Sequence, residues 1–288
     1  MASRDSPTAW RRWLAQELRG LRVDQRISQR DAAERCGWSG ARLSYLETGQ
    51  RPVLPEDLDV LLPLYDVSKE ERQQYYDAVE RSQAEGWWER FEKLIAKWTQ
   101  DYIGYEQGAV EIRAFEPVVV PGLLQTEGYA SALMRSGIRQ RSEREIARLV
   151  ELRLARQAIL TRPDQPTRLD VIVDESVLHR SPTEPGILTA QLEHLAEMAK
   201  RPNVVLRVVP LEGGLQGFSI GPFSILSFPG DRPDPLVFVE NRAGASWIEE
   251  FESVERFSLG FEGLLKAALD PEASLAMVRE AAERHARQ

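Results

Sequence analysis

Two short helix signals separated by one glycine turn have the most informative spacing in the sequence. Ser28 precedes a polar run that ends at Cys36 and Gly37, and Ser39 precedes a second run that ends at Glu47. A serine can accept a hydrogen bond from the first turn of a helix, and glycine commonly ends one. Two capped helices at this spacing predict a helix-turn-helix, whose second helix enters the DNA major groove. The alternative is a small helical bundle that binds no nucleic acid.

Residues that could hold a metal or transfer protons have no matching spacing. The three histidines, His179, His194 and His285, stand in unrelated contexts, and Cys36 is the single cysteine. Metal sites need several such ligands at defined spacings. Glu175 and His179 could meet across a bend, which leaves an acid–base pair as an alternative. We expect no enzyme, and neither a metal nor a cofactor.

Two further patterns favour structural roles. Asp170 and Asp174 share one face of a predicted strand but lie about 13 Å apart at ~3.3 Å per residue, beyond the ~5–9.5 Å of carboxylates that act on one glycosidic bond, so we interpret them as charges at a strand edge. The glycine-rich segment 212–217 precedes a strand rather than a helix. Without a helix N-terminus to bind phosphate, this segment is predicted to be a turn.

The charge of the chain is unevenly distributed. The 288 residues carry a net charge of -8, yet residues 1–54 contain ten arginines, no lysine and six acidic residues, a net charge of +4. The remaining residues therefore carry -12. A basic N-terminal module joined to an acidic body favours a polyanion such as DNA as the ligand of the module.

Helical periodicity extends over the first third of the chain. Helices are predicted to start at Ser6-Pro7, Ser28, Ser39 and Pro55, and a helical pattern continues from about residue 68 to about residue 105 through an aromatic stripe that we interpret as helix core. The polar stretch 81–86 is a candidate hinge.

The pattern changes in the second half of the chain. Helices are predicted at 126–136, 142–161, 186–200, 253–269 and 271–285, and residues 115–122 are predicted to be extended because of their prolines. Short β-branched runs predict strands at 169–174, 204–209, 221–228 and 236–240, with a further candidate at 245–249. The first two strands flank a helix, and the next two form a hairpin.

These patterns predict an α+β protein with three parts. Residues 1–67 form an all-α helix-turn-helix domain, residues 68–108 a helical connector, and residues 109–288 a mixed α/β domain with a small sheet. No stretch approaches the ~20 apolar residues of a membrane helix, and no secretory signal precedes the first helix. With one cysteine, a cytoplasmic location is expected.

Residues 27–51 resemble the phage-repressor-like (Xre-type) helix-turn-helix. The Ser-Gln start, the Ala-Glu helix and the Glu-Thr-Gly frame are in register with that motif. The rest of the chain resembles the actinomycete WhiJ-like regulators. The matching segments are Phe115-Glu-Pro-Val-Val-Val-Pro-Gly-Leu-Leu-Gln-Thr126, Arg148-Leu-Val-Glu-Leu-Arg-Leu-Ala-Arg-Gln157, Val173-Asp-Glu-Ser-Val-Leu178 and Val239-Glu-Asn-Arg-Ala-Gly244.

The resemblance also implies which residues face DNA. They are Gln29, Ser39, Gly40, Ala41, Arg42, Ser44 and Tyr45. The family usually has long polar side chains after the capping serine, whereas this chain has Gly40 and Ala41. Ala41 could touch a thymine methyl group, so Arg42 and Tyr45 are expected to supply most of the direct readout. Arg51 is expected to contact phosphate, with an exposed solvated arginine as the alternative.

Other residues of this unit are expected to stabilise its fold. Glu47 stands where the motif uses an acid to hold its own helices, and Leu43 and Leu46 face inward. Trp38 is interpreted as an apolar residue at the turn, and Cys36 as a small buried hydrophobe rather than a redox sensor.

Partners follow from the same resemblance. It implies a two-fold homodimer on a double-stranded DNA operator and a small BldB-type protein that docks on the body and modulates DNA binding. Exposed parts of residues 115–125 and the two closing helices are candidates for that contact. Two alternatives stay open: an antitoxin-like sequestering protein with autoregulatory DNA binding, and a one-component regulator whose C-terminal domain senses a small molecule.

Overall fold

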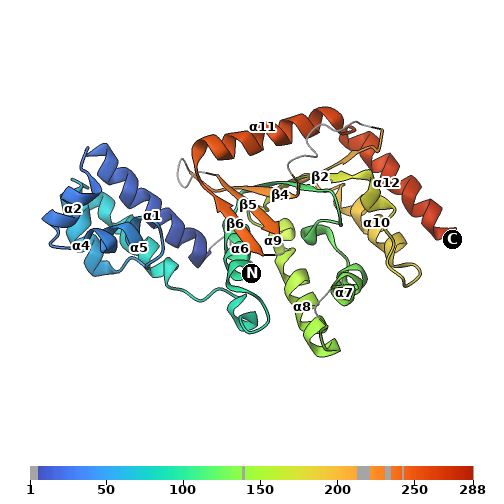
Figure 1. The fold of residues 1–288 in the computed structure, drawn as a ribbon, viewed down its shortest axis with the longest axis horizontal. Coiled ribbons are helices and arrows are strands. Elements are labelled where there is room, and N and C mark those ends of the chain that lie inside the picture. Colours follow the sequence, from blue (N-terminus) through green and yellow to red (C-terminus); the bar gives the residue numbers. More distant parts are fainter. Residues whose placement is uncertain (1–5, 138–139, 213–220, 231–234, 242, 288) are drawn as a thin grey trace.

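The structure is a computed structural model that describes residues 6–137, 140–212, 221–230, 235–241 and 243–287. Figure 1 shows helices gathered at one end of the molecule and a sheet flanked by helices at the other. We call residues 7–82 the head, residues 83–108 the connector and residues 109–287 the body. The predicted α+β class is confirmed, because the head is all-helical and the body contains a mixed sheet.

The head consists of helices that begin at the predicted serine and proline signals. Ser28 Oγ accepts a hydrogen bond from Asp31 N at 3.1 Å, and Ser39 Oγ accepts one from Arg42 N at 3.2 Å. Gly37, at the turn between the two capped helices, has a φ of 67° that favours glycine. The helices are α1 (Pro7–Asp24), α2 (Gln29–Arg35), α3 (Gly40–Glu47), α4 (Pro55–Leu64) and α5 (Lys69–Ser82).

Helix α5 shares the hydrophobic core of the four helices before it. Tyr75 and Val79 of α5 belong to one buried cluster with Leu14 and Leu18 of α1 and Leu43 of α3. The domain boundary after residue 67 stays a prediction, but the packing groups α5 with the head.

The connector is less helical than the pattern from residue 68 to 105 predicts, although α5 ends at Ser82, inside the candidate hinge 81–86. Between α5 and α6 (Lys97–Gly108) the only regular element is the 3₁₀ turn η1 (Glu89–Phe91), and all of this stretch is described. Trp88 and Phe91 pack with Ile103 of α6 and Leu152 of a body helix instead of along a helix of their own. Tertiary packing therefore overrides the helical spacing of these aromatic residues.

The body is built on a sheet with strand order β3-β2-β1-β4-β5-β6. β1 pairs in parallel with β2 and antiparallel with β4, so it lies in the middle of the sheet, although only its last residues fall in the segment predicted to be extended. The predicted strand-helix-strand unit and hairpin are confirmed as parallel β2 and β3 and antiparallel β4 and β5. The strands are β1 (Glu111–Glu116), β2 (Arg168–Asp174), β3 (Val204–Val209), β4 (Phe223–Ser227), β5 (Leu236–Asn241) and β6 (Gly244–Ile248).

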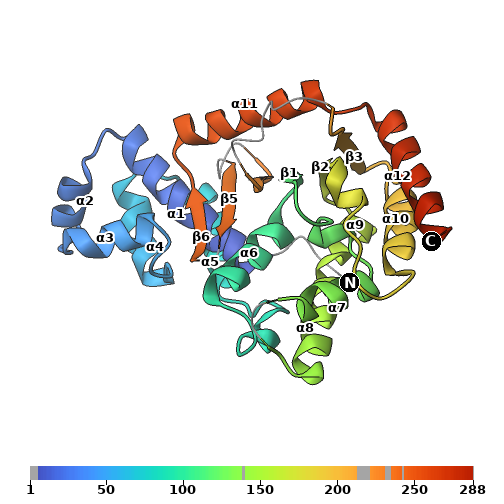
Figure 2. The same ribbon diagram turned by 45° about the vertical axis from the view of Figure 1, so that its right-hand side comes forward.

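Helices cover both faces of the sheet. Helix α11 (Phe251–Ala267) packs on one face, where Phe261 and Leu264 contact a cluster that includes Phe115 and Ile172. Figures 1 and 2 show α11 alone on that side and the other body helices against the opposite face or edge. These elements are η2 (Gly122–Leu124), α7 (Glu127–Arg135), α8 (Glu143–Arg156), α9 (Ala158–Thr161), η3 (Glu175–Leu178), α10 (Ile187–Met198) and α12 (Pro271–Ala286). Among the residues described, no helix has the length and apolar character needed to cross a bilayer.

The interpretation of Asp170 and Asp174 as strand-edge charges is wrong. Strand β2 lies between β3 and β1, and both aspartates are buried. Asp170 Oδ1 accepts a hydrogen bond from Arg207 Nη1 at 2.6 Å, and Asp174 Oδ1 accepts one from Ser176 N at 2.9 Å. Each carboxylate is therefore compensated inside the fold, one by an ion pair and one by capping η3.

Candidate DNA-binding surface and charged pocket

A buried ion pair fixes the two helices of the helix-turn-helix against α1. Glu47, at the end of α3, accepts hydrogen bonds from Arg22 Nε at 2.7 Å and Arg22 Nη2 at 2.9 Å. Arg22 Nη1 also donates to Ile27 O at 2.8 Å, and Gln29 Nε2 donates to Glu47 Oε2 at 3.0 Å. The network joins α1, the start of α2 and the end of α3, which agrees with the structural role predicted for Glu47.

The N-terminal end of α3 is open to solvent. Ser39, Gly40 and Ala41 are exposed, and one turn further along the side chain of Tyr45 is 50% exposed. Arg51 is exposed as well, and its backbone N–H donates to Tyr45 O at 3.1 Å. Together with the half-buried Ser44, these residues form one surface that a DNA groove could reach; their contact with DNA stays a prediction.

Two of the predicted DNA-facing side chains already have partners inside the head. Arg42 Nη2 forms an ion pair with the buried Asp57 Oδ1 at 2.6 Å, and its guanidinium lies 4.0 Å from the centre of the Trp38 ring. Gln29 is held by Glu47. A change at Arg42 would therefore disturb head packing together with any base contact, which makes Ala41 and Tyr45 the cleaner positions for tests of readout.

The head meets the rest of the chain through α1 and α6. Ser6 Oγ donates to Gly104 O at 2.6 Å, and Arg12 Nε forms an ion pair with Glu249 Oε1, beyond β6, at 3.2 Å. Glycine allows the close approach of the two helices, because a Cβ atom at Gly104 would lie 2.5 Å from Thr8 Cβ and one at Gly108 would lie 2.5 Å from Ala9 Cβ. We call this contact the α1–α6 junction.

We expect Gly104→Ala to weaken the α1–α6 junction. The added methyl group has no space beside Thr8, and overpacking of this kind costs roughly 1–3 kcal/mol. Gly263→Ala in α11 is the matched control, since nothing lies within 4 Å of its Cβ position and alanine favours a helix by up to ~1 kcal/mol. Thermal unfolding should show a lower midpoint for Gly104→Ala and an equal or higher one for Gly263→Ala; equal losses would refute the close approach.

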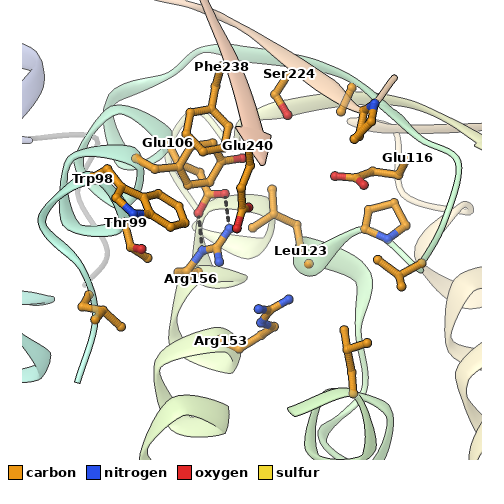
Figure 3. Close-up of a pocket in the computed structure, with 18 of the residues that line it drawn as sticks. Trp98, Thr99, Glu106, Glu116, Leu123, Arg153, Arg156, Ser224, Phe238 and Glu240 are labelled. Carbon is orange, nitrogen blue, oxygen red and sulfur yellow. Dashed lines mark hydrogen bonds and ion pairs between the residues drawn. The ribbon is translucent and has the colours of Figure 1, made fainter. Parts of the chain in front are cut away.

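A pocket of about 690 Å³ opens between the sheet and the helices α6 and α8 (Figure 3). Its aromatic wall consists of Trp98, Tyr102 and Phe238, and the rings of Tyr102 and Phe238 have their centres 4.4 Å apart. Charged side chains face the same space from α6, α8, β1 and β5. They are Glu106, Glu116, Arg153, Arg156 and Glu240.

The charges in the pocket differ in how they are compensated. Arg156 forms a bidentate pair with the buried Glu106, with both N–O distances at 2.8 Å. Arg153 Nη1 donates to the amide oxygen of Gln125 at 3.0 Å, and burial lowers the pKa of Arg153 to about 10. Burial, followed by the nearby charge of Glu240, raises the pKa of Glu116 to about 7.

Glu116 makes the stability of the body depend on pH. Its pKa in the folded state, about 7, is above the reference value of 4.5, so the folded protein holds a proton that the unfolded chain releases, and stability falls as the pH rises through this interval. We expect Glu116→Gln to raise the thermal midpoint relative to the unsubstituted chain more at pH 8 than at pH 5. Glu92→Gln, at an exposed position, should show no such difference. If Glu116→Gln changed the thermal midpoint equally at both pH values, the raised pKa of Glu116 would be contradicted.

Sequence reasoning did not identify the pocket. Three of the segments that carry the resemblance supply four of the charged side chains named above: Glu116 from 115–126, Arg153 and Arg156 from 148–157, and Glu240 from 239–244. Nothing in the spacing of these charged residues along the chain indicated that they face one another. Only the fold shows that these segments meet.

His179 and Cys36, the other residues considered for chemistry, do not line the pocket. His179 Nε2 lies 3.4 Å from Glu175 Oε1, so the two groups of the acid–base alternative do meet, but the second oxygen of Glu175 accepts a hydrogen bond from Leu211 N at 2.8 Å. Burial raises the pKa of the Cys36 thiol, which packs against the head core but is half-buried rather than buried. No group of three or more potential metal ligands occurs within the described ranges. Residues 213–217 of the predicted glycine-rich turn lie outside the described residues.

Comparisons with known proteins give two family matches. The model described as "Domain of unknown function (DUF5753)" matches residues 99–280, from α6 into α12, and includes every charged residue of the pocket named above. The model described as "Helix-turn-helix domain" matches residues 13–74, from α1 into α5. No curated protein and no solved structure gave a match.

Proposed function

Because the chain belongs to the DUF5753 family and carries a helix-turn-helix domain before that region, we propose that it is a sequence-specific DNA-binding transcription regulator. The observation that carries the proposal is the exposed N-terminal end of α3, a helix that the buried pair of Arg22 and Glu47 holds against α1. The net charge of +4 over residues 1–54 supports it, since phosphate contacts dominate affinity for DNA. As a regulator of the Xre type with a WhiJ-like body, the chain binds as a homodimer and has no catalytic role.

Selection from a pool of random duplex DNA tests this proposal. The full chain should enrich one motif made of two half-sites whose centres lie about one helical turn, 10–10.5 bp, apart, because each protomer of the dimer presents one α3. Light scattering of the complex should give two chains per operator. A pool that stays random after repeated rounds would overturn sequence-specific binding, and a single unpaired half-site would overturn the dimer.

We further propose that the body binds the small protein partner that the resemblance implies. Of residues 115–125, only Val118 is exposed, so most of that candidate segment is unavailable for contact. Helix α11 supports the other candidate, because Phe251 is 77% exposed and Leu259 is 59% exposed on its surface. Apolar side chains exposed in this way are typical of protein contacts.

A titration of the selected operator tests the partner. A BldB-type protein encoded beside this chain should change operator affinity, and the double variant Phe251→Ser and Leu259→Ser should remove that change while binding the operator normally. A partner that binds the body without altering operator affinity would favour the antitoxin-like alternative. If the small protein does not bind this chain, the proposed partner is overturned and the DNA-binding proposal is unaffected.

A further inference from the structure

The pocket of the body has the size and composition of a ligand site. Its volume of about 690 Å³ lies within the ~300–1,000 Å³ typical of small-molecule sites, which combine apolar walls with a few convergent polar groups. Figure 3 shows Arg153 pointing upward from α8 into this space, with Glu116 and Glu240 reaching it from different strands. Trp98 and Phe238, with rings stacked 6.2 Å apart, provide a flat apolar wall.

Three of the five charged side chains named above lack an ion-pair partner among the described residues. Arg156 is neutralised by Glu106, but Arg153 reaches only the neutral amide of Gln125. Glu116 and Glu240 make no hydrogen bond or ion pair within the part of the chain that the structure describes. Arg153 and Glu116 are half-buried, and a partly buried charge without a direct partner is costly, so a ligand that supplies the opposite charges gains free energy from them.

From this arrangement we propose that the pocket binds a small zwitterionic molecule with an aromatic body. Its carboxylate pairs with Arg153, whose planar guanidinium suits bidentate binding of a carboxylate. Its ammonium group lies between Glu116 and Glu240, and its ring packs on Trp98 and Phe238. The proposal goes beyond DNA binding and does not depend on it.

Helix α6 gives such a ligand a route to the head. Tyr102 and Glu106 of α6 line the pocket, while Gly104 and Gly108 of the same helix contact α1 at the α1–α6 junction. A ligand that favours one position of α6 would therefore bias the position of the head, provided that it binds the two positions with different affinities.

Four derivatives of one dipeptide test the charge assignment. L-phenylalanyl-L-phenylalanine carries both charges, its C-terminal amide only the ammonium, its N-acetyl form only the carboxylate, and the doubly blocked form neither. Calorimetric titration into the full chain without DNA should show the zwitterion binding at least tenfold more tightly than each of the other three. No detectable binding of the zwitterion, or equal binding of a singly blocked form, would overturn the proposal.

Variants then assign each charge to its residue. Arg153→Met should weaken the zwitterion at least tenfold, whereas Arg148→Met, at an exposed position of the same helix, should leave its affinity unchanged. Glu240 is exposed near the end of β5, and Glu240→Gln should weaken binding of the zwitterion but not of the N-acetyl form. Equal effects of Arg153→Met and Arg148→Met, or an equal loss for both ligand forms in Glu240→Gln, would refute the assigned orientation. Without ligand, Arg153→Met and Glu240→Gln should bind the operator as tightly as the unsubstituted chain. A failure of the ligand proposal can therefore be distinguished from a failure of the DNA-binding proposal.

Discussion

Glu47→Ala is expected to destabilise the head by about 3–5 kcal/mol, the usual cost of removing one partner from a buried ion pair. The substitution leaves the guanidinium of Arg22 buried without its bidentate partner and removes the acceptor of Gln29. Because this network joins α1, α2 and α3, the loss should affect all three helices together. Hydrogen exchange of the full chain should show their amides opening far more readily, while amides of the sheet keep their protection.

Glu34→Ala is the matched control in the same part of the chain. Its partner Arg30 lies 2.9 Å away in an exposed i,i+4 pair, a geometry worth about 0.3–0.5 kcal/mol. Hydrogen exchange in this variant should differ little from that of the unsubstituted chain. If Glu47→Ala were as mild as Glu34→Ala, the pair of Arg22 and Glu47 would not hold the helix-turn-helix together.

Ala41→Glu is expected to lower operator affinity about a hundredfold, which corresponds to ~2.8 kcal/mol at about 1.4 kcal/mol per factor of ten. The substitution places a carboxylate at the exposed end of α3 that would face DNA phosphates and base edges, where like charges repel. Ala41 lies in the first turn of α3, after the cap Ser39, and an acid there favours the helix dipole. A loss of binding would therefore not come from unfolding of α3. Titration of the selected operator measures the change.

Gln74→Glu adds the same charge to the head at an exposed position on α5 and serves as the control. It should reduce operator affinity by no more than a few fold, because only the long-range field of the head changes. Similar losses for Ala41→Glu and Gln74→Glu would mean that the N-terminal end of α3 does not contact DNA.

The head could be predicted closely from the sequence because its signals are local. Ser28 and Ser39 cap the helices that follow them, and Gly37 supplies the turn, so each boundary depends on residues within a few positions. Strands β2 to β5 were predicted for a similar reason, since their β-branched runs are bounded by proline, glycine or aspartate.

The features that the sequence did not reveal depend on distant residues. The central strand β1 is stabilised by neighbours that follow it by more than 50 residues, Arg168 and Ser227 among them. The ion pair of Arg42 with Asp57 of α4 joins residues of two helices, which the helix-turn-helix pattern does not encode. The pocket required the fold to bring Glu116, Arg153 and Glu240 to one space.

Sequence-specific DNA binding by the α3 surface is tested most directly by two dissociation constants measured at 150 mM salt. One is for the selected operator and the other is for a duplex of the same length and composition with a shuffled sequence, both with the full chain. We expect the operator to bind at least about 10³-fold more tightly, as is typical of specific over non-specific binding. Equal affinities for the two duplexes would contradict the assignment of this chain as a sequence-specific regulator.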